Sequence, residues 1–350
     1  MLFSQTGLTH SDSARVTPGL TLIAPMQGDM VFLVDETGGE VHRWHTGVGL
    51  TKWCYMLPGG RLLANERVAN PSGVDLTLSG RVSIYDWDST LIWQHDDPGQ
   101  HHDARQLDDG RLIYLANTPL TDKERAAIVG GVPGTEPEGG PFGEVIREVD
   151  STGTIRWEWP FTNFGFDRFP LHRNANRWVH GHANTIQPLR DGRYLVPSKV
   201  MNLIFIVNPA TDKVEWHYQN DAMGGQHDVQ MLDSGNILLF ANGTYAPYLH
   251  ASEVWELNPD TKEIVWRYRQ KDNPLAFYSP MVSGCQRLPS SNTLVCEGAK
   301  GCVAEVTPEG DVVRQYINPV FNSHEKLGSF NWLFRARRYA RDGQEIEKRV

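Results

Sequence analysis

Three histidines of this chain, His102, His182 and His227, stand in short and similar stretches of sequence. His102 and His227 are each followed by an aspartate and then by alternating apolar and polar residues, and His182 stands two residues before a third such stretch that starts at Asn184. A neutral imidazole can act as a nucleophile, as an acid or base near neutral pH, or as a metal ligand. If the fold brings the three histidines together, they are suited to group transfer, acid–base catalysis or metal binding.

Each of these stretches forms the first half of a predicted β-hairpin. The stretch that begins at His227 turns at Asp233-Ser234-Gly235 and continues as an apolar strand up to Phe240. Alternating residues, a Gly-containing turn and a second strand are the signature of a hairpin. The pattern recurs in four further copies, which start near residues 52, 102, 184 and 283. The chain is therefore a repeat, and its three histidines lie at or next to equivalent positions.

A second hairpin type alternates with the first. Six copies occur; the last copy reaches Gln315 without a tryptophan, and the others end at Trp44, Trp93, Trp157, Trp216 and Trp266. Two hairpins in a repeat of this size indicate the four-stranded blade of a β-propeller. Because one blade cannot bury both of its faces alone, the tryptophans are expected to pack between neighbouring blades.

The ends of the chain supply the missing hairpin, because six outer hairpins face only five inner ones. Residues 332–339 form a strand-like segment whose natural partner is the segment 19–24. Pairing the two closes the ring and removes the open sheet edge. We therefore predict one all-β domain over residues 1–350, a six-bladed β-propeller of four-stranded blades that is closed by pairing the C-terminal strand with N-terminal strands.

Three segments fall outside the repeat. Residues 1–16 are expected to be a polar leader, and an insertion at 117–143 contains a helical piece followed by a loop rich in Gly and Pro. The insertion at 161–181 is rich in aromatic residues, including Phe166 and Trp178, and leads directly into His182. Long loops in a compact repeat are often functional, so this second insertion is expected to cover the channel mouth and hold a substrate ring.

The first residues of the inner hairpins should meet around the central channel. By register they are Lys52, His102, Asn184 with His182, His227, Ser283 and a residue near Arg335. Lys199, one strand beyond Asn184, could reach an anionic group there. Since neighbouring residues of a strand point to opposite faces, Asp103 and Asp228 are expected to brace a backbone or an adjacent blade. Further histidines near the mouth are His101, His172, His180 and His324.

Composition excludes several classes of partner. The 350-residue chain has a net charge of −9 and no long basic run, which argues against nucleic acid. Its apolar runs have the length of strands, so no membrane span is expected. The four cysteines show no Cys-x-x-Cys spacing and are expected to be reduced core thiols. Residues 1–7 lack the pattern of a secretory signal, and together these features predict a cytoplasmic protein.

At these residues the sequence resembles the arylsulfate sulfotransferase family, whose catalytic domain is a six-bladed propeller. The resemblance rests on the segments 18–25, 182–184, 227–228, 292–310 and 334–339. The characterised periplasmic members also carry an N-terminal β-domain and an export signal, which this sequence does not show.

The resemblance implies a role for each channel residue. His227 corresponds to the histidine that accepts the sulfuryl group from a phenolic sulfate ester. His182 and Asn184 correspond to the pair that holds the sulfuryl oxygens, and His102 to a further channel histidine. Lys199 stands where the family has a sulfuryl-binding arginine, so the charge is kept but the planar fork of donors is lost.

Three functions remain open from the sequence. In the first, a sulfotransferase-like enzyme without a cofactor uses His227 as nucleophile and His102 as acid or base on a small aromatic or anionic substrate. Here Asn184 and Lys199 bind the substrate together with Arg335, Lys52, Ser283, Phe166 and Trp178. In the second, the three histidines serve as acid and base, or bind a divalent metal, in a lyase or hydrolase. The third is a non-catalytic binding propeller. The sequence does not indicate an oligomeric state.

Overall fold

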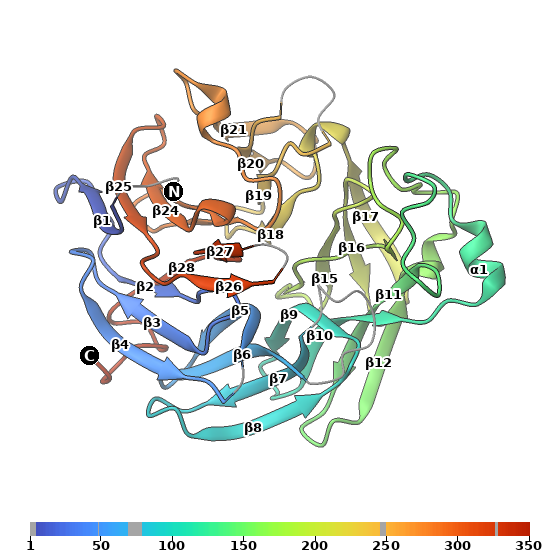
Figure 1. Cartoon of the computed structure of the whole chain (residues 1–350), viewed down its shortest axis with the longest axis horizontal. Helices are drawn as coiled ribbons and strands as arrows, with labels where there is room; N and C mark the ends of the chain where they lie inside the picture. Colours follow the sequence, from blue (N-terminus) through green and yellow to red (C-terminus); the bar gives the residue numbers. More distant parts are fainter. Residues whose placement is uncertain (1–4, 48, 69–78, 246–249, 326–327) are drawn as a thin grey trace.

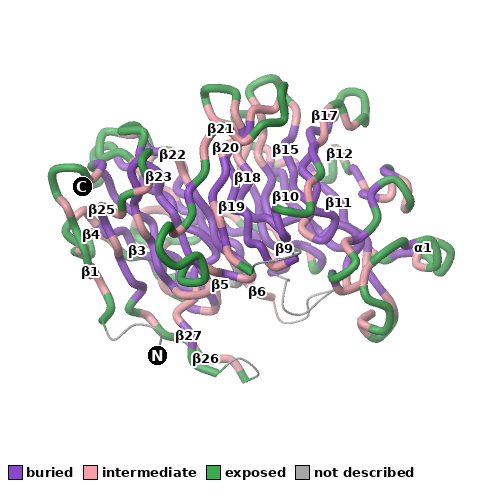
Figure 2. Tube along the Cα trace, turned by 90° about the horizontal axis from the view of Figure 1, so that it is seen from above, coloured by how far each residue is buried: buried purple, intermediate pink, exposed green. Residues whose placement is uncertain are grey.

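The computed structural model describes residues 5–47, 49–68, 79–245, 250–325 and 328–350. Its strands form six antiparallel sheets of four or five strands, arranged as a ring around a central axis (Figure 1). The prediction of an all-β, six-bladed propeller is therefore confirmed. Buried residues lie in the strands and exposed ones in the loops at the edges of the ring (Figure 2).

Each blade runs from an inner strand at the axis to an outer strand at the rim. Blade 1 holds β28 (Arg337–Tyr339), β2 (Leu20–Ile23), β3 (Met30–Val34) and β4 (Glu40–His45). Blade 2 holds β5 (Leu50–Leu57), β6 (Arg61–Arg67), β7 (Gly80–Tyr85) and β8 (Leu91–Asp96). Blade 3 holds β9 (Gln100–Gln106), β10 (Leu112–Thr118), β11 (Phe142–Val149) and β12 (Ile155–Pro160), with the short β13 (Val179–His180) parallel to β11.

The second half of the ring follows the same order. Blade 4 holds β14 (Gln187–Pro188), β15 (Tyr194–Ser198), β16 (Leu203–Asn208) and β17 (Lys213–Gln219). Blade 5 holds β18 (His227–Met231), β19 (Ile237–Ala241), β20 (Glu253–Leu257) and β21 (Ile264–Tyr268). Blade 6 holds β22 (Gly284–Arg287), β23 (Thr293–Glu297), β24 (Cys302–Val306) and β25 (Val312–Ile317).

The two ends of the chain close the ring. β28 pairs antiparallel with β2, with Tyr339 opposite Leu20 and Arg337 opposite Leu22, so the predicted closure is confirmed. The expected leader is only partly a leader, because β1 (Gly7–Ser11) pairs with β25 and adds a fifth strand to blade 6. The strand satisfies backbone groups of β25 that would otherwise form an open edge.

The outer tryptophans join the blades as expected. In five blades an indole N–H donates to the following blade, with acceptors at Asp86 O, Ser151 O, Asp212 Oδ1, Pro259 O and Pro308 O for Trp44, Trp93, Trp157, Trp216 and Trp266. In blade 6, where the tryptophan is absent, the buried Arg314 donates to the carbonyls of Asp35 and Glu36 in blade 1. A guanidinium thus makes the interblade contact at the sixth junction.

The helix expected in the insertion 117–143 is present, whereas several aromatic residues of the insertion 161–181 are buried in the core. The helical piece is α1 (Asp122–Ala127), whose N-terminus carries a capping box between Thr121 and Glu124. In the second insertion, Phe161, Phe164 and Phe169 are buried in a core cluster with Trp159 and Phe205. These aromatic rings stabilise blades 3 and 4 and are not available to hold a substrate.

Short helices and one further hairpin complete the described structure. The 3-10 turns are η1 (Phe161–Phe164), η2 (Asp221–Met223), η3 (Pro274–Ala276) and η4 (Gly298–Lys300). The hairpin of β26 (Asn322–His324) and β27 (Gly328–Phe330) lies near the ring centre in Figure 1 and projects from one face in Figure 2. None of the helices in the described residues has the length and apolar sequence that a membrane crossing requires. All four cysteines are buried thiols outside any disulfide.

Glutamine side chains bind the backbone of the next blade close to the axis. The Gln286 amide donates to Arg338 O at 2.9 Å and accepts from Arg338 N at 2.7 Å, which ties blade 6 to the closing strand. Gln187 makes the same pair of bonds with Met231, between blades 4 and 5. The interblade junctions near the axis therefore depend on specific polar contacts as well as on apolar packing.

We predict that Gln286→Ala lowers the free energy of unfolding by about 1–3 kcal/mol, because it leaves two backbone groups of the closing strand without their partner. Chemical denaturation of the variant and the native protein measures the difference. Gln94 is exposed on β8 and serves as the control, with Gln94→Ala expected to change the stability by less than about 0.5 kcal/mol. Equal stabilities of the Gln286 variant and the native protein would contradict the prediction.

Candidate functional site

The three predicted histidines lie close together, near the starts of the inner strands of blades 3, 4 and 5. The rings of His102 and His182 are 5.1 Å apart between centroids. The ring of Phe334 lies 5.7 Å from His102 and 6.0 Å from His227. All three histidines are buried or nearly so. The cluster therefore combines blades 3, 4 and 5 around an aromatic ring from the segment that leads into β28.

An irregular backbone at the start of the inner strands positions these side chains. His102 and His182 have positive φ angles of 54° and 51°, and Asp228 and Ser283 have 55° and 87° at the corresponding entries of blades 5 and 6. The pairing register shifts within β9 and within β18 at the same places. Such bulges redirect side chains at the end of a strand. The left-handed conformation is strained for residues other than glycine.

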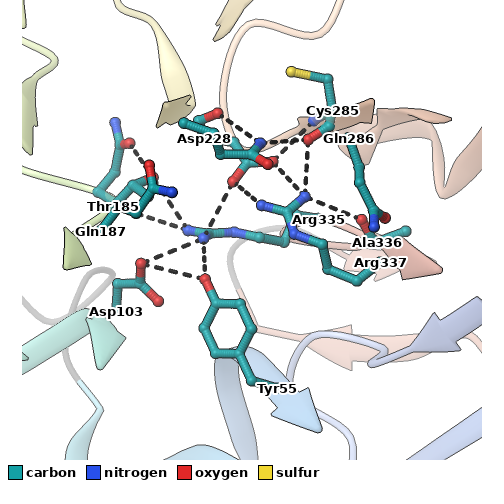
Figure 3. Close-up of polar contacts among 12 residues, drawn as sticks. Tyr55, Asp103, Thr185, Gln187, Asp228, Cys285, Gln286, Arg335, Ala336 and Arg337 are labelled. Carbon is teal, nitrogen blue, oxygen red and sulfur yellow. Dashed lines mark hydrogen bonds and ion pairs between the residues drawn. The ribbon is translucent and has the colours of Figure 1, made fainter. Parts of the chain in front are cut away.

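One arginine, Arg335, lies at the centre of a network of polar contacts between the blades (Figure 3). Arg335 has no exposed surface, and its guanidinium lies 3.3 Å from both Asp103 Oδ2 and Asp228 Oδ1. It also donates to the Tyr55 hydroxyl at 2.5 Å and to Asn184 O at 2.8 Å. These partners belong to blades 2, 3, 4 and 5.

Blade 6 completes the surroundings of this arginine through a glycine. A Cβ added to Gly284 would lie 2.7 Å from Arg335 Cβ and would also overlap Asp228 Oδ2. Only a residue without a side chain leaves room there for Arg335. Arg335, which precedes the inner strand of blade 1, therefore lies against residues of the five other blades.

Asp103 and Asp228 bind an adjacent blade, as the alternation of side chains along a strand predicted. Asp103 Oδ2 accepts from Ile186 N at 3.0 Å, and Asp228 Oδ2 accepts from Cys285 N at 2.9 Å. Each carboxylate thus binds the backbone of the inner strand in the next blade and not its neighbouring histidine. Burial by itself raises the pKa of Asp228, but Arg337 and Arg335 outweigh burial and hold that pKa below its usual value.

The register of the closing strand corrects the sequence prediction by one residue. Phe334 occupies the level of the histidines, and Arg335 occupies the level of Asp103 and Asp228. Arg335 is therefore a buried structural residue, contrary to its expected place in substrate binding. Its burial follows from its two carboxylate partners, because an arginine at this depth needs compensating charge.

An asparagine that the sequence analysis missed determines the tautomer of His227. His227 Nδ1 lies 2.7 Å from Asn242 Oδ1. The Asn242 amide nitrogen donates to Ser279 O and Val282 O at 2.8 and 3.0 Å, which orients its oxygen toward the imidazole. His227 must then donate from Nδ1, so Nε2 is the nitrogen with the lone pair. The repeated pair Ala-Asn at residues 64–65, 116–117 and 241–242 was the available signal.

Asn184 and Lys199 lie in the same region as the histidines. Asn184 is fully buried, and its amide donates to Gln226 O at 2.8 Å, directly before His227. Lys199 is half-buried and donates its backbone N–H to His182 O at 3.1 Å. Its stem runs beside Gly225, where an added Cβ would lie 3.3 Å from Lys199 Cγ. Burial lowers the pKa of the Lys199 ammonium to about 8, and no carboxylate in the described residues pairs with it.

The other residues predicted to bind substrate have contacts outside the histidine cluster or lie outside the described side chains. The Ser283 hydroxyl is buried and accepts from Gly298 N at 3.0 Å. Phe166 packs against the buried His180 at 4.7 Å between ring centroids, and Trp178 is partly exposed. Lys52 lies in β5, but its side chain falls outside the described part of the structure. Their roles in substrate binding stay predictions.

Two further histidines, His180 and His172, have other surroundings. Burial lowers the pKa of His180 to about 4, and the ring of His172 stacks on Tyr245 at 5.0 Å. Among the described residues, no three His, Cys, Asp or Glu side chains are arranged to hold a metal ion. The arrangement around His102, His182 and His227 is suited to nucleophilic and acid–base chemistry on an anion.

A comparison with protein families matches the sequence of this chain to a known group. The family model described as Arylsulfotransferase (ASST) matches residues 54–319, about three quarters of the chain. The chain belongs to the arylsulfotransferase family. Its six blades are thus the propeller expected of an arylsulfotransferase, and the match spans His102, His182 and His227. No curated protein matches the chain in sequence.

Solved structures show the same fold at low sequence identity. A protein of unknown function from Bacteroides caccae is 16% identical with a TM-score of 0.57, over 91% of this chain and 98% of that chain. A streptogramin B lyase is 10% identical with a TM-score of 0.50, over 95% of this chain and 93% of that chain. At these identities the likeness concerns the fold alone.

We predict that Arg335→Met lowers the free energy of unfolding by about 3–5 kcal/mol, because it removes the fully buried guanidinium that lies between the carboxylates of Asp103 and Asp228. Denaturant titration of the native protein and the variant measures the loss. Arg190 forms an exposed ion pair with Asp233, and Arg190→Met is the control, with a change of less than about 1 kcal/mol expected. A similar small change in both variants would show that Arg335 is not essential to the ring.

Proposed function

We propose that this arylsulfotransferase-family chain transfers a sulfuryl group from an aryl sulfate to a phenolic acceptor through His227. The observation that supports the proposal best is the contact between His227 Nδ1 and Asn242 Oδ1. It makes Nε2 the nucleophilic nitrogen of a buried imidazole. The family match supports the same reaction class.

The proposed first half of the reaction moves the sulfuryl group to the protein. His227 Nε2 attacks sulfur, the bond between sulfur and the phenolic oxygen breaks, and the phenolate leaves with that electron pair. His182, Asn184 and the Lys199 ammonium stabilise the negative charge on the sulfuryl oxygens. In the second half the oxygen of an acceptor hydroxyl attacks the same sulfur, the hydroxyl proton passes to His102, and the bond between sulfur and His227 Nε2 breaks, which restores His227.

The substrate of this reaction is a small anionic aromatic molecule. Lys199 supplies a cation next to His182, and its charge has no carboxylate partner among the described residues. Phe334 presents an aromatic ring between His102 and His227. A flat aromatic donor can pack on such a ring, with its sulfate directed to the lysine and the histidines.

We predict that His227→Asn lowers the turnover of a chromogenic aryl sulfate with phenol as acceptor by about 1000-fold or more, because it removes the nucleophile. Incubation of the native protein with donor alone should also add one sulfuryl group to His227, which intact-protein and peptide mass spectrometry measure. His45 is exposed at the end of β4, and His45→Asn is the matched control with native turnover.

The results separate the remaining functions. Native turnover in His227→Asn would refute the covalent scheme. Absence of turnover in the well-folded native protein would favour a lyase or hydrolase, and metal analysis of protein purified without a histidine tag would then follow. Channel variants without any effect on a bound or converted ligand would favour a non-catalytic binding propeller.

We predict that binding of the aryl sulfate weakens as the pH rises through about 8, because Lys199 then loses its charge. Lys199→Arg should remove this dependence, since an arginine stays protonated, and Lys199→Met should bind weakly at every pH. The KM of the donor, measured for all three proteins between pH 6 and about 9.5, checks the expectation. If the KM of Lys199→Arg still rose with pH as in the native protein, the pH dependence would belong to another group.

A further inference from the structure

A chain of three buried side chains leads from the wall of blade 3 to the histidine cluster. His101 Nδ1 lies 2.7 Å from His102 Nδ1, and His101 Nε2 lies 2.7 Å from Glu144 Oε1. Glu144, His101 and His102 are between 1% and 3% exposed. The carboxylate and both imidazoles are thus in series, with His102 at the end that faces His182.

The irregular backbone of β9 makes this chain possible. Adjacent residues of a regular strand point to opposite faces, so neighbouring histidines would not normally meet. At His102 the φ angle is 54°, and the register with β10 shifts between Ala104 and His101. The two rings are consequently perpendicular, with an interplanar angle of 89° and centroids 4.9 Å apart.

Glu144 is held in place by blade 4. Its second oxygen accepts from Ala183 N at 3.1 Å, directly beside His182. A Cβ on Gly181 would lie 2.6 Å from Glu144 Cβ, so the glycine allows the close approach of the carboxylate. Glu144 therefore couples the wall of blade 3 to the entry of blade 4.

The contacts favour one arrangement of the protons. The carboxylate accepts only, which favours the proton of neutral His101 on Nε2, although this N–H does not point straight at the oxygen. His101 Nδ1 then accepts, His102 Nδ1 donates, and His102 Nε2 carries the lone pair. When His102 Nε2 takes up a proton, its Nδ1 proton can move to His101, so that the positive charge lies beside Glu144.

We propose that Glu144 and His101 are positioning residues that make His102 the acid and base of the sulfuryl transfer. The inference rests on the function proposed above and adds two residues to it. The cycle starts from the relay with this extra proton, and in the first half-reaction His102 Nε2–H gives its proton to the departing phenolate oxygen. In the second, His102 Nε2 takes the proton of the acceptor hydroxyl while oxygen attacks sulfur and the bond between His227 and sulfur breaks. The relay thus returns to its protonated state after each cycle.

Two aryl sulfate donors that differ in the acidity of the leaving phenol distinguish a role in proton transfer from a purely structural role. A donor with an acidic phenol as leaving group needs no proton, whereas a donor with a weakly acidic phenol does. In Glu144→Gln we expect the burst of phenol release from the acidic donor to keep its native rate. Transfer to phenol, and release from the weakly acidic donor, should each slow by roughly 100-fold. Rapid-mixing kinetics with both donors measure the three rates.

Matched variants keep the test independent of folding. Glu148 is buried on the same strand and contacts Arg111 and Tyr194, so Glu148→Gln should leave all three rates unchanged. His101→Asn interrupts the relay at its middle and should reproduce the pattern of Glu144→Gln. Thermal unfolding of each variant verifies that it is folded, and His101→Asn carries the test alone if Glu144→Gln is not.

Each remaining result refutes the relay in a recognisable way. If Glu144→Gln and His101→Asn both transferred to phenol and released the weakly acidic phenol at native rates, the relay would be refuted while the covalent scheme would stand. Equal slowing of all three rates would reduce Glu144 to a structural residue. Absence of a burst and of a modified His227 in the native protein would refute the proposed function, and the relay with it.

Discussion

The structure depends on the buried ion pairs between Arg335 and the carboxylates of Asp103 and Asp228 at the centre of the ring. A guanidinium without exposed surface has lost its hydration, so it is tolerated only where charges and acceptors replace water. Here strands of several blades supply those groups at once. Because the same carboxylates bind the backbones of Ile186 and Cys285, the position of each inner strand is tied to the next.

This layer of charge also determines the geometry of the candidate site. His102 and His227 each stand one residue before an aspartate of this layer. Because the aspartates are held by ion pairs, the backbone next to them is rigid and limits how far the imidazoles can move. Different partners then orient different rings: Asn242 binds His227, and His101 with Glu144 binds His102. A repeat thus produces unequal chemistry from equal positions, because the residue behind each histidine differs from blade to blade. Such support is what keeps a reactive group in its productive orientation.

Local patterns predicted the fold, and long-range contacts account for what they missed. The hairpin turns, the tryptophan series and the contact of Asp103 with the adjacent blade follow from residue order and strand alternation alone. The one-residue error at Arg335 arose because no hairpin turn precedes the closing strand, so only its pairing with β2 sets the register. The relay through Glu144 could not be read from sequence, since it requires a bulge in β9 and a glycine far along the chain to come together.

The charge balance around the histidines bears on the role proposed for Lys199 in binding an anionic substrate. Arg335 and Arg337 face Asp103 and Asp228 in the buried layer, and Arg105 lies 3.7 Å from Asp103, so the two carboxylates offset much of the attraction of these arginines for a sulfate. Lys199 lies near the histidines without a carboxylate partner in the described residues, and its field is not offset in this way. Partial burial strengthens that field, because less water screens it, and the same burial lowers the pKa of the ammonium. The attraction for an anion and the sensitivity to alkaline pH therefore have one physical cause.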